Sequence, residues 1–204
     1  GADTLNGGAD NDTIYGDAGD DTINGDAGDD TLIGGTGDDA INGGTGTDTV
    51  DYSSDGAAVV VDLENQTATD GSGGSDTLDS IENATGSDYD DQLTGSTGDN
   101  VLIGGAGNDT IDDGGGGTDT LTGDAGNDTF VIYDASGSGT ITDFTIGSDI
   151  IDLSAVSAIG NFGQLQSAAT DDGSGNTVID LGTGSTLTLT GITEADLNNS
   201  DFLF

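Results

Sequence analysis

The chain has 204 residues, of which 40 are acidic and none is lysine, arginine or histidine, so that its formal net charge is -40. It contains no cysteine and no run of about 18 apolar residues, which excludes disulfides, thiolate metal sites and a transmembrane helix. Because no cationic side chain is present, we expect no binding of nucleic acid and no direct binding of an anionic membrane surface.

The acidic residues are almost all aspartates, because the only glutamates are Glu64, Glu82 and Glu194. A chain with so much charge and only 31% hydrophobic residues is similar in composition to disordered proteins, so disorder is the alternative to a fold. Aspartate beside abundant glycine favours another interpretation, since aspartate tolerates tight turns and is a ligand for hard cations. Aliphatic residues at regular spacing indicate an ordered chain.

A repeat of nine residues fills the segment 1–51. Its complete units are GGADNDTIY, GDAGDDTIN, GDAGDDTLI, GGTGDDAIN and GGTGTDTVD, and the first six residues, GADTLN, fit positions four to nine of a further unit. Each complete unit opens with glycine, has aspartate at its sixth position and has an aliphatic residue at its eighth. Because the chain begins inside a unit, we expect it to be the C-terminal part of a longer protein.

The segment 52–85 departs from this period. Residues 52–70, which include the apolar run AAVVV (57–61), predict one longer strand or two strands, and GSGGSDTLD (71–79) is a degenerate copy of the repeat. We expect this segment to form larger coils that connect two repeat arrays in one continuous solenoid. Separate domains joined by a linker are the alternative.

A second array occupies residues 86–131. Its units are GSDYDDQLT, GSTGDNVLI, GGAGNDTID, GGGGTDTLT and GDAGNDTFV. Asp113 is a one-residue insertion between two units, and Asn100 replaces the sixth-position aspartate of one unit. The second array therefore keeps the pattern of the first with two local changes.

The pattern predicts a stack of short strands. Positions one to six are a turn in which glycines supply positive φ, and positions seven to nine are a strand whose eighth residue points inward. Two units make a coil of 18 residues, so sixth-position aspartates of successive coils lie above one another at about 4.8 Å. Such a stack requires a divalent cation, and calcium suits it best because it binds six or more carboxylate and carbonyl oxygens in flexible geometry.

The units resemble the RTX (repeats-in-toxin) nonapeptide, G-G-x-G-x-D-x-U-x with U aliphatic, over residues 1–51 and 86–131. The resemblance implies an all-β fold: a right-handed parallel β-roll or β-helix solenoid with calcium-binding turns and a β-rich C-terminal cap. It also implies that each calcium lies between successive coils, held by two sixth-position side chains and by carbonyls of the glycine turns. The pairs would be Asp3/Asp21, Asp12/Asp30, Asp21/Asp39, Asp30/Asp48, Asp91/Asp109, Asn100/Asp119 and Asp109/Asp128, which gives about seven ions.

The turn glycines that the resemblance places at these sites are Gly7, Gly16, Gly19, Gly25, Gly28, Gly34, Gly37, Gly43, Gly46, Gly95, Gly98, Gly104, Gly107, Gly123 and Gly126. Aspartates at the second and fifth positions are expected to be solvated charges rather than ligands. They are Asp17, Asp26 and Asp124 at the second position, and Asp20, Asp29 and Asp38 at the fifth.

The segment 132–204 forms the C-terminal cap in this interpretation. GTITDFTIGSDIIDLS (139–154) resembles the region that follows the last repeat in serralysin-like proteases and other type I secretion substrates, and the segment 177–192 predicts a β-hairpin around Gly182–Gly184. The terminus, TEADLNNSDFLF, resembles a type I secretion target region. The alternative is that Phe202, Leu203 and Phe204 only cover an apolar solenoid end.

The resemblance implies a calcium-binding module that folds on calcium binding outside the cell and carries the secretion signal of a larger bacterial protein, which would be secreted or held at the cell surface. Calcium ions and, during export, the type I secretion apparatus are the expected partners. Catalysis is not expected of this segment, because it has no histidine, cysteine, lysine or arginine, although an enzymatic domain upstream is compatible with it.

Two alternatives remain open. Stacked threonines (Thr4, Thr13, Thr22, Thr31, Thr49) and asparagines (Asn6, Asn24, Asn42) predict a flat polar ladder, as in ice-binding repeats or in the surface of an adhesin or surface-layer protein. Threonine is, however, also an ordinary outward strand residue. An anionic glycan is a further candidate ligand, and it could be held only through bridging calcium.

Overall fold

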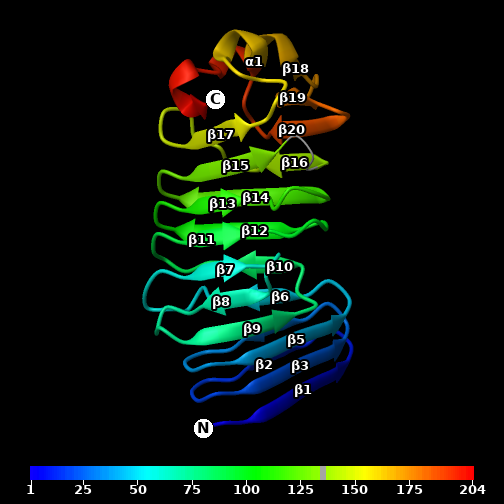
Figure 1. Ribbon diagram of the computed structural model, residues 1–204, viewed down its shortest axis with the longest axis vertical. Helices are drawn as coiled ribbons and strands as arrows, with labels where there is room; N and C mark the ends of the chain where they lie inside the picture. Colours follow the sequence, from blue (N-terminus) through cyan, green and yellow to red (C-terminus); the bar gives the residue numbers. More distant parts are fainter. Residues whose placement is uncertain (134–136) are drawn as a thin grey trace.

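The chain forms an elongated stack of β-coils that rises from the N-terminus to a C-terminal cap (Figure 1). The computed structural model describes residues 1–133 and 137–204. Two sheets lie along the stack, and most neighbouring strands are parallel. The predicted all-β solenoid of stacked parallel coils is therefore confirmed.

The strands of each sheet follow one another along the stack. The first sheet has the order β1 (Thr4–Ala9), β3 (Thr22–Ala27), β5 (Ala40–Thr45), β9 (Ser75–Asp79), β8 (Thr67–Thr69), β7 (Val60–Asp62), β11 (Gln92–Thr94), β13 (Thr110–Asp112), β15 (Thr129–Tyr133), β17 (Ile150–Ala155) and β21 (Phe202–Leu203). The second has the order β2 (Thr13–Tyr15), β4 (Thr31–Ile33), β6 (Thr49–Asp51), β10 (Asn83–Thr85), β12 (Val101–Ala106), β14 (Thr118–Ala125), β16 (Ser138–Ile141), β20 (Ser185–Leu189), β19 (Thr177–Gly182) and β18 (Ala169–Asp171).

The register of the strands follows the 18-residue coil that the repeat predicts. Thr4 pairs with Thr22, and Ile23 pairs with Ile41. Eighth-position residues of the complete units point into the space between the sheets, and all but Ile14 at the open N-terminal end are at most 2% exposed; the buried ones are Ile23, Leu32, Ile41, Val50, Leu93, Leu102, Ile111, Leu121 and Phe130. Each unit thus adds one aliphatic or aromatic side chain to a continuous core, which is the main favourable term for stacking.

The segment between the arrays contains an antiparallel excursion. β7 and β8 are two short strands joined by a tight turn, and both β7–β8 and β8–β9 pair antiparallel. The turn is fixed by Asp62, whose carboxylate accepts hydrogen bonds from the backbone N–H and the side-chain Nδ2 of Asn65, both at 2.8 Å. Of the two interpretations of residues 52–70, two strands is therefore the correct one, and of the apolar run 57–61 only Val60 and Val61 lie in a strand.

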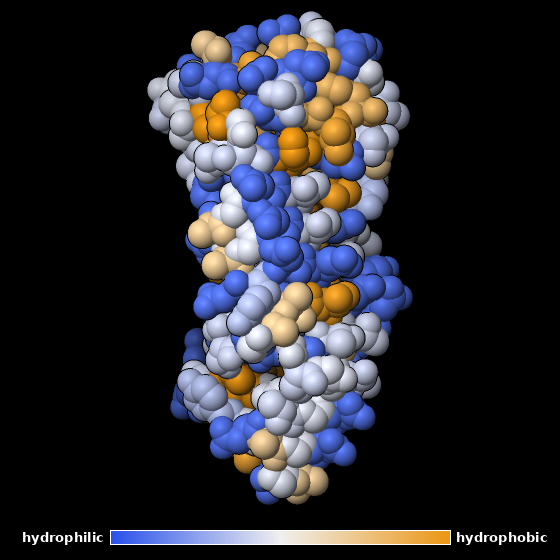
Figure 2. All heavy atoms as spheres, turned by 90° about the vertical axis from the view of Figure 1, so that its left-hand side faces the viewer, coloured by the Kyte–Doolittle hydropathy of each residue, from blue (hydrophilic) through white to orange (hydrophobic). Residues whose placement is uncertain are grey.

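The C-terminal segments close the stack. The helix α1 (Phe162–Ala168) begins at Asn161, whose side chain accepts the N–H of Gln164, and the short 3-10 turns η1 (Glu194–Asp196) and η2 (Asn199–Asp201) precede β21. The predicted hairpin is confirmed by the antiparallel pair β19–β20. In Figure 2 hydrophobic residues gather mainly in the upper part of the molecule, with smaller patches lower down among hydrophilic and intermediate residues. No helix among the described residues is long and apolar enough to cross a membrane.

Candidate metal centre

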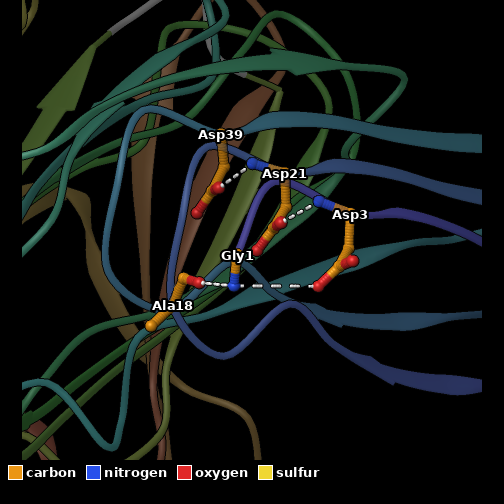
Figure 3. A network of polar contacts seen from close by, with 5 residues as sticks. All are labelled: Gly1, Asp3, Ala18, Asp21 and Asp39. Carbon is orange, nitrogen blue, oxygen red and sulfur yellow. Dashed lines mark hydrogen bonds and ion pairs between the residues drawn. The ribbon is translucent and has the colours of Figure 1, made fainter.

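Sixth-position side chains of successive coils are joined by a hydrogen bond of one kind. The backbone N–H of Asp3 donates to Oδ1 of Asp21 at 2.6 Å, and the N–H of Asp21 donates to Oδ1 of Asp39 at 2.8 Å (Figure 3). The same bond joins Asp12/Asp30, Asp30/Asp48, Asp91/Asp109, Asn100/Asp119 and Asp109/Asp128. The structure therefore brings together all seven pairs that the resemblance implies. We call these stacked side chains the inner ladder.

The second carboxylate oxygen of the inner ladder is buried. Among the described residues, Oδ2 has no hydrogen-bond partner in Asp21, Asp30, Asp39, Asp48, Asp109 and Asp119, and each of these side chains is at most 2% exposed. Asp3 and Asp12 lie at the open N-terminal end and remain exposed and half-buried, respectively. A buried carboxylate without a partner is costly, and the sequence has no basic side chain to pair with it. These atoms require a bound cation or a proton.

First-position glycines leave room for this oxygen. A Cβ on Gly7 would lie 2.7 Å from Oδ2 of Asp12 and 2.7 Å from the carbonyl oxygen of Gly25 in the next coil. The space beside such a glycine is thus shared by a carboxylate oxygen and a main-chain carbonyl. The same collision with the turn's own carboxylate holds for Gly16, Gly25, Gly34, Gly43, Gly104 and Gly123. At Gly16, Gly25 and Gly43 a carbonyl oxygen of the neighbouring coil lies beside the carboxylate as it does at Gly7, so oxygen atoms from two coils converge at these turns.

Fourth-position glycines allow the turns to stack closely. Gly28, Gly37 and Gly46 have φ of +140°, +136° and +143°, which L side chains rarely adopt. A Cβ at any of these positions would also collide with main-chain atoms of the preceding coil, and the same holds for Gly19, Gly107 and Gly126 against their neighbouring coils. A side chain here would push successive turns apart.

Burial raises the pKa values of several aspartates of the inner ladder. The pKa values of Asp109 and Asp119 rise to about 7 and that of Asp128 to about 6, first because burial disfavours the charged form and further because other carboxylates lie nearby. Burial also raises the pKa values of Asp39 and Asp48. Without a cation, these turns hold their charge at an electrostatic cost.

The repeat pattern did not identify three members of the inner ladder. Asp76 accepts the N–H of Asp39 at 3.0 Å, Glu82 accepts that of Asp48 at 2.8 Å through Oε2, and Asp149 accepts that of Asp128 at 3.0 Å. Asp76 is the sixth residue of the degenerate copy 71–79, and Glu82 and Asp149 each stand two residues before a buried strand residue, Ala84 and Ile151. That sixth-to-eighth spacing is the signal that would have found them.

The inner ladder changes in the segment between the two arrays, where Tyr52 and Val59 contact two of its aspartates. Tyr52 is 1% exposed and donates its hydroxyl to Oδ2 of Asp76 at 2.8 Å, so this carboxylate has a donor on each oxygen. Burial and the adjacent Asp76 charge raise the pKa of Tyr52, which keeps the hydroxyl protonated. We call the space between two successive positions of the inner ladder a level. The level between Val59 and Asp91 has a single acidic side chain, because Val59 stands where other coils have a carboxylate and its N–H donates to Oδ1 of Asp91.

Second- and fifth-position aspartates are exposed, as predicted. Those at the fifth position also have a structural role that the pattern did not indicate: Asp20 accepts the N–H of Asp38 at 3.1 Å, and Asp29 accepts that of Thr47 at 2.9 Å. In these bonds the N–H belongs to the later coil and the carboxylate to the earlier one. In the inner ladder the N–H belongs to the earlier coil and the carboxylate to the later one. Each turn is therefore attached to its neighbour at two points.

The donors at these turns fit calcium. All are carboxylate or carbonyl oxygens, and the chain has no histidine or cysteine for zinc. Within residues 1–133 and 137–204, no group of three or more acidic side chains gathers into a metal cluster. A site with two carboxylates, whose other ligands are main-chain carbonyls, is consistent with that finding. It also suits the flexible oxygen coordination of calcium.

Comparison with known proteins agrees with this chemistry. The family model of the RTX calcium-binding nonapeptide repeat matches four stretches, residues 1–32, 25–55, 85–112 and 113–131, which together make up half of the chain. No curated protein matches the sequence.

Two solved structures are similar to parts of the chain. The extracellular lipase LipA from Serratia marcescens has 24% identity over 96% of this chain with a TM-score of 0.39, and this chain spans 38% of the lipase. The AlgE6R3 subunit of the Azotobacter vinelandii mannuronan C5-epimerase has 24% identity over 57% of this chain and 78% of its own, with a TM-score of 0.24. From the repeats that the family model matches, the chain belongs to the family of RTX calcium-binding nonapeptide repeat proteins.

Proposed function

We propose that the chain is a module that folds when it binds calcium outside the cell. The observation that carries this proposal is the set of buried Oδ2 atoms without a partner in the inner ladder. Two carboxylates about 4 Å apart repel by about 1 kcal/mol in water and by about 4 kcal/mol at an effective dielectric constant of 20. Repeated at each level, this repulsion opposes folding until a cation is bound.

Calcium supplies the folding free energy in this proposal. Metal sites that do not exist in the unfolded chain contribute their binding free energy directly to folding. The seven predicted pairs correspond to about seven ions, with sites of the extracellular type having Kd values of about 10⁻⁴–10⁻³ M. The additional pairs Asp39/Asp76, Asp48/Glu82 and Asp128/Asp149 are further candidates. The ligands are the sixth-position side chains and the carbonyls of the turn glycines named above.

The location of the chain follows from the same mechanism. In a cytosol with little calcium the charge of -40 would keep the chain unfolded, and an unfolded chain is suited to export. We therefore assign it to a bacterial protein exported by a type I apparatus, with the export signal in the last residues. Outside, Phe202 and Leu203 join the sheet as β21 beside β17, so folding would withdraw the signal after export. The activity of the whole protein would lie in residues outside this chain.

A calcium titration followed by circular dichroism tests the proposal. We expect an unfolded spectrum in EGTA and a cooperative transition to a β spectrum as calcium reaches roughly millimolar levels. Magnesium at the same concentration is the control, and it should give little folding because it demands octahedral geometry and keeps its waters. A β spectrum that persists in excess EGTA would contradict the mechanism.

A polar surface ladder supports a second candidate, an adhesive or ice-binding surface. β1, β3 and β5 pair in register, so Asn6, Asn24 and Asn42 stack, and Nδ2 of Asn24 donates to Oδ1 of Asn6 at 3.0 Å. Ala40 interrupts the row that Thr4 and Thr22 begin. Thermal hysteresis measured with calcium present tests this candidate, and a value equal to that of buffer would reject ice binding.

A further inference from the structure

Asn100 closes one level of the inner ladder without a cation. Its Nδ2 donates to the main-chain carbonyl of Glu82 at 2.5 Å, and because a carbonyl only accepts, the nitrogen of the amide must face it. At the preceding level the side chain of Glu82 presents a carboxylate oxygen to the earlier coil instead. An amide N–H offers no lone pair to a cation. The level between Glu82 and Asn100 is therefore bridged by a hydrogen bond where its neighbours present oxygen.

The next level has one sixth-position carboxylate. The N–H of Asn100 donates to Oδ1 of Asp119 at 3.0 Å, as elsewhere in the ladder. Oδ2 of Asp119 is buried without a hydrogen-bond partner in a side chain that is 1% exposed. The amide oxygen of Asn100 already accepts the N–H of Ser96 at 2.7 Å. Asp119 thus needs a second anionic ligand if a divalent cation is to be held there.

The inserted residue Asp113 takes the place of a first-position glycine. Its carbonyl oxygen lies 2.8 Å from the position of a Cβ on Gly95, as the carbonyl of Gly25 lies 2.7 Å from that of a Cβ on Gly7. In regular turns a Cβ at the first position would collide with the turn's own sixth-position carboxylate, as at Gly104 and at Gly123. A side chain at this position is therefore directed at the sixth-position carboxylate, which in this turn belongs to Asp119.

The extra residue makes room for that side chain. Gly115 has a φ of +83°, and its Cβ position has no atom within 4 Å, whereas Gly114, Gly116 and Gly117 lie against the preceding coil. The turn is widened at Gly115, whose N–H donates to Oδ1 of Asp113 at 3.1 Å. Asp113 is 0% exposed, so a first-position carboxylate is enclosed within the turn.

The charge of Asp113 reaches Asp119. Burial does most to raise the pKa of Asp119, and among the neighbouring charges that raise it the charge of Asp113 is the largest. The sequence has no basic side chain with which either carboxylate could pair. Two enclosed carboxylates and a set of main-chain carbonyls make a donor set suited to calcium.

We propose that Asp113 and Asp119 together hold a divalent cation within a single widened turn, in place of the two-coil site that Asn100 interrupts. This site rests on the proposed calcium-dependent folding and adds a ligand that the nonapeptide pattern does not contain. The level between Glu82 and Asn100 holds no cation.

Native mass spectrometry of the full chain in calcium counts the bound ions and tests the site. We expect Asp113→Asn to bind one calcium fewer than the parent chain, since the amide keeps the hydrogen bond to Gly115 and loses the charge. Asp124→Asn is the matched control, because Asp124 is exposed and asparagine tolerates its φ of +61°. It removes the same charge and should leave the count unchanged.

A second variant keeps the test independent of folding in the first. Asn100→Asp restores a carboxylate between Glu82 and Asp119, and it should bind one calcium more than the parent chain. An unchanged count in Asp113→Asn would overturn the role of Asp113, and an unchanged count in Asn100→Asp would overturn the closed level. A parent chain that binds no calcium at all would instead reject the proposed function.

Discussion

The N–H of Asp21 donates to Oδ1 of Asp39 one coil further along the stack, while Oδ2 of Asp39 is buried without a hydrogen-bond partner. One carboxylate therefore does two tasks. Oδ1 fixes the register between coils by accepting a hydrogen bond from the main chain. Oδ2 remains for a cation, so stacking and cation binding are coupled in Asp39 and in the other ladder aspartates whose Oδ2 has no hydrogen-bond partner.

Removing one charge from the middle of the inner ladder is expected to weaken calcium-induced folding. Asp30→Asn keeps an acceptor for the N–H of Asp12 but loses charge at the levels Asp12/Asp30 and Asp30/Asp48. The calcium midpoint of folding should rise by about tenfold, which corresponds to about 1.4 kcal/mol. Circular dichroism during a calcium titration measures the shift.

Asp26→Asn is the matched control for this change. Asp26 is exposed and has a φ of +74°, a conformation that asparagine also tolerates, and the substitution removes the same charge. Its midpoint should stay close to that of the parent chain. Equal shifts in the two variants would show that total charge, rather than the inner ladder, controls folding.

The repeat was sufficient to predict the coil, because its period fixes which residues stack. Glycine at the first position, aspartate at the sixth and an aliphatic residue at the eighth each have one structural role, and the paired strands show an 18-residue spacing in the first array. The spacing of Asp21 and Asp39 alone predicted their contact. A pattern of this kind does not depend on distant parts of the chain.

Outside the repeat, contacts depend on tertiary structure and were not predicted. Nothing local connects Tyr52 with Asp76, 24 residues away, although their hydrogen bond is buried. Glu82 was not identified because its unit lacks the glycine turn, and the β7–β8 hairpin depends on a turn whose residue Gln66 has a φ of +58°. Such features follow from how the segment 52–85 fits between two arrays.

Acid is expected to replace calcium in part. The pKa values of Asp109 and Asp119 are about 7 in the folded chain, raised by burial from an ordinary value of 3.8. Their contribution to the stability of the metal-free fold is therefore fully present below about pH 4 and is lost as the pH rises through about 7. Calcium-free protein should gain β structure as the pH falls from about 8 to about 5, a limit set above the pI of about 4.1.

The same protonation should oppose calcium. Protons compete for carboxylates that must be ionised to bind the metal, so the calcium midpoint should rise as the pH falls below about 7. Circular dichroism of resin-treated protein, with and without added calcium, measures both effects. A metal-free chain whose β signal is the same at both pH values would mean that the raised pKa values do not limit its folding.

A methyl group beside the inner ladder should displace an oxygen. The Cβ of Gly25→Ala would collide with Oδ2 of Asp30 and with the carbonyl of Gly43. The φ of Gly25 is not positive, so the cost is steric. Unfolding by denaturant in saturating calcium should show a loss of about 1–3 kcal/mol. Gly56→Ala, where nothing lies within 4 Å, should be nearly neutral, and equal losses would contradict the crowding.

The C-terminal cap depends on Phe202. Its ring lies 6.5 Å from that of Phe144 and 6.3 Å from that of Phe162, and its backbone pairs with Ile151 to add the last strand to the first sheet. Phe202→Ala removes a side chain that is 4% exposed and should cost about 3–5 kcal/mol in saturating calcium, measured by denaturant unfolding. The adjacent Leu203 is 49% exposed, so Leu203→Ala should cost less than about 0.5 kcal/mol. If the terminus stabilises the fold by covering the apolar end of the stack, replacing the buried Phe202 should cost more than replacing the exposed Leu203. Equal costs would mean that the terminal strand contributes through its backbone pairing alone.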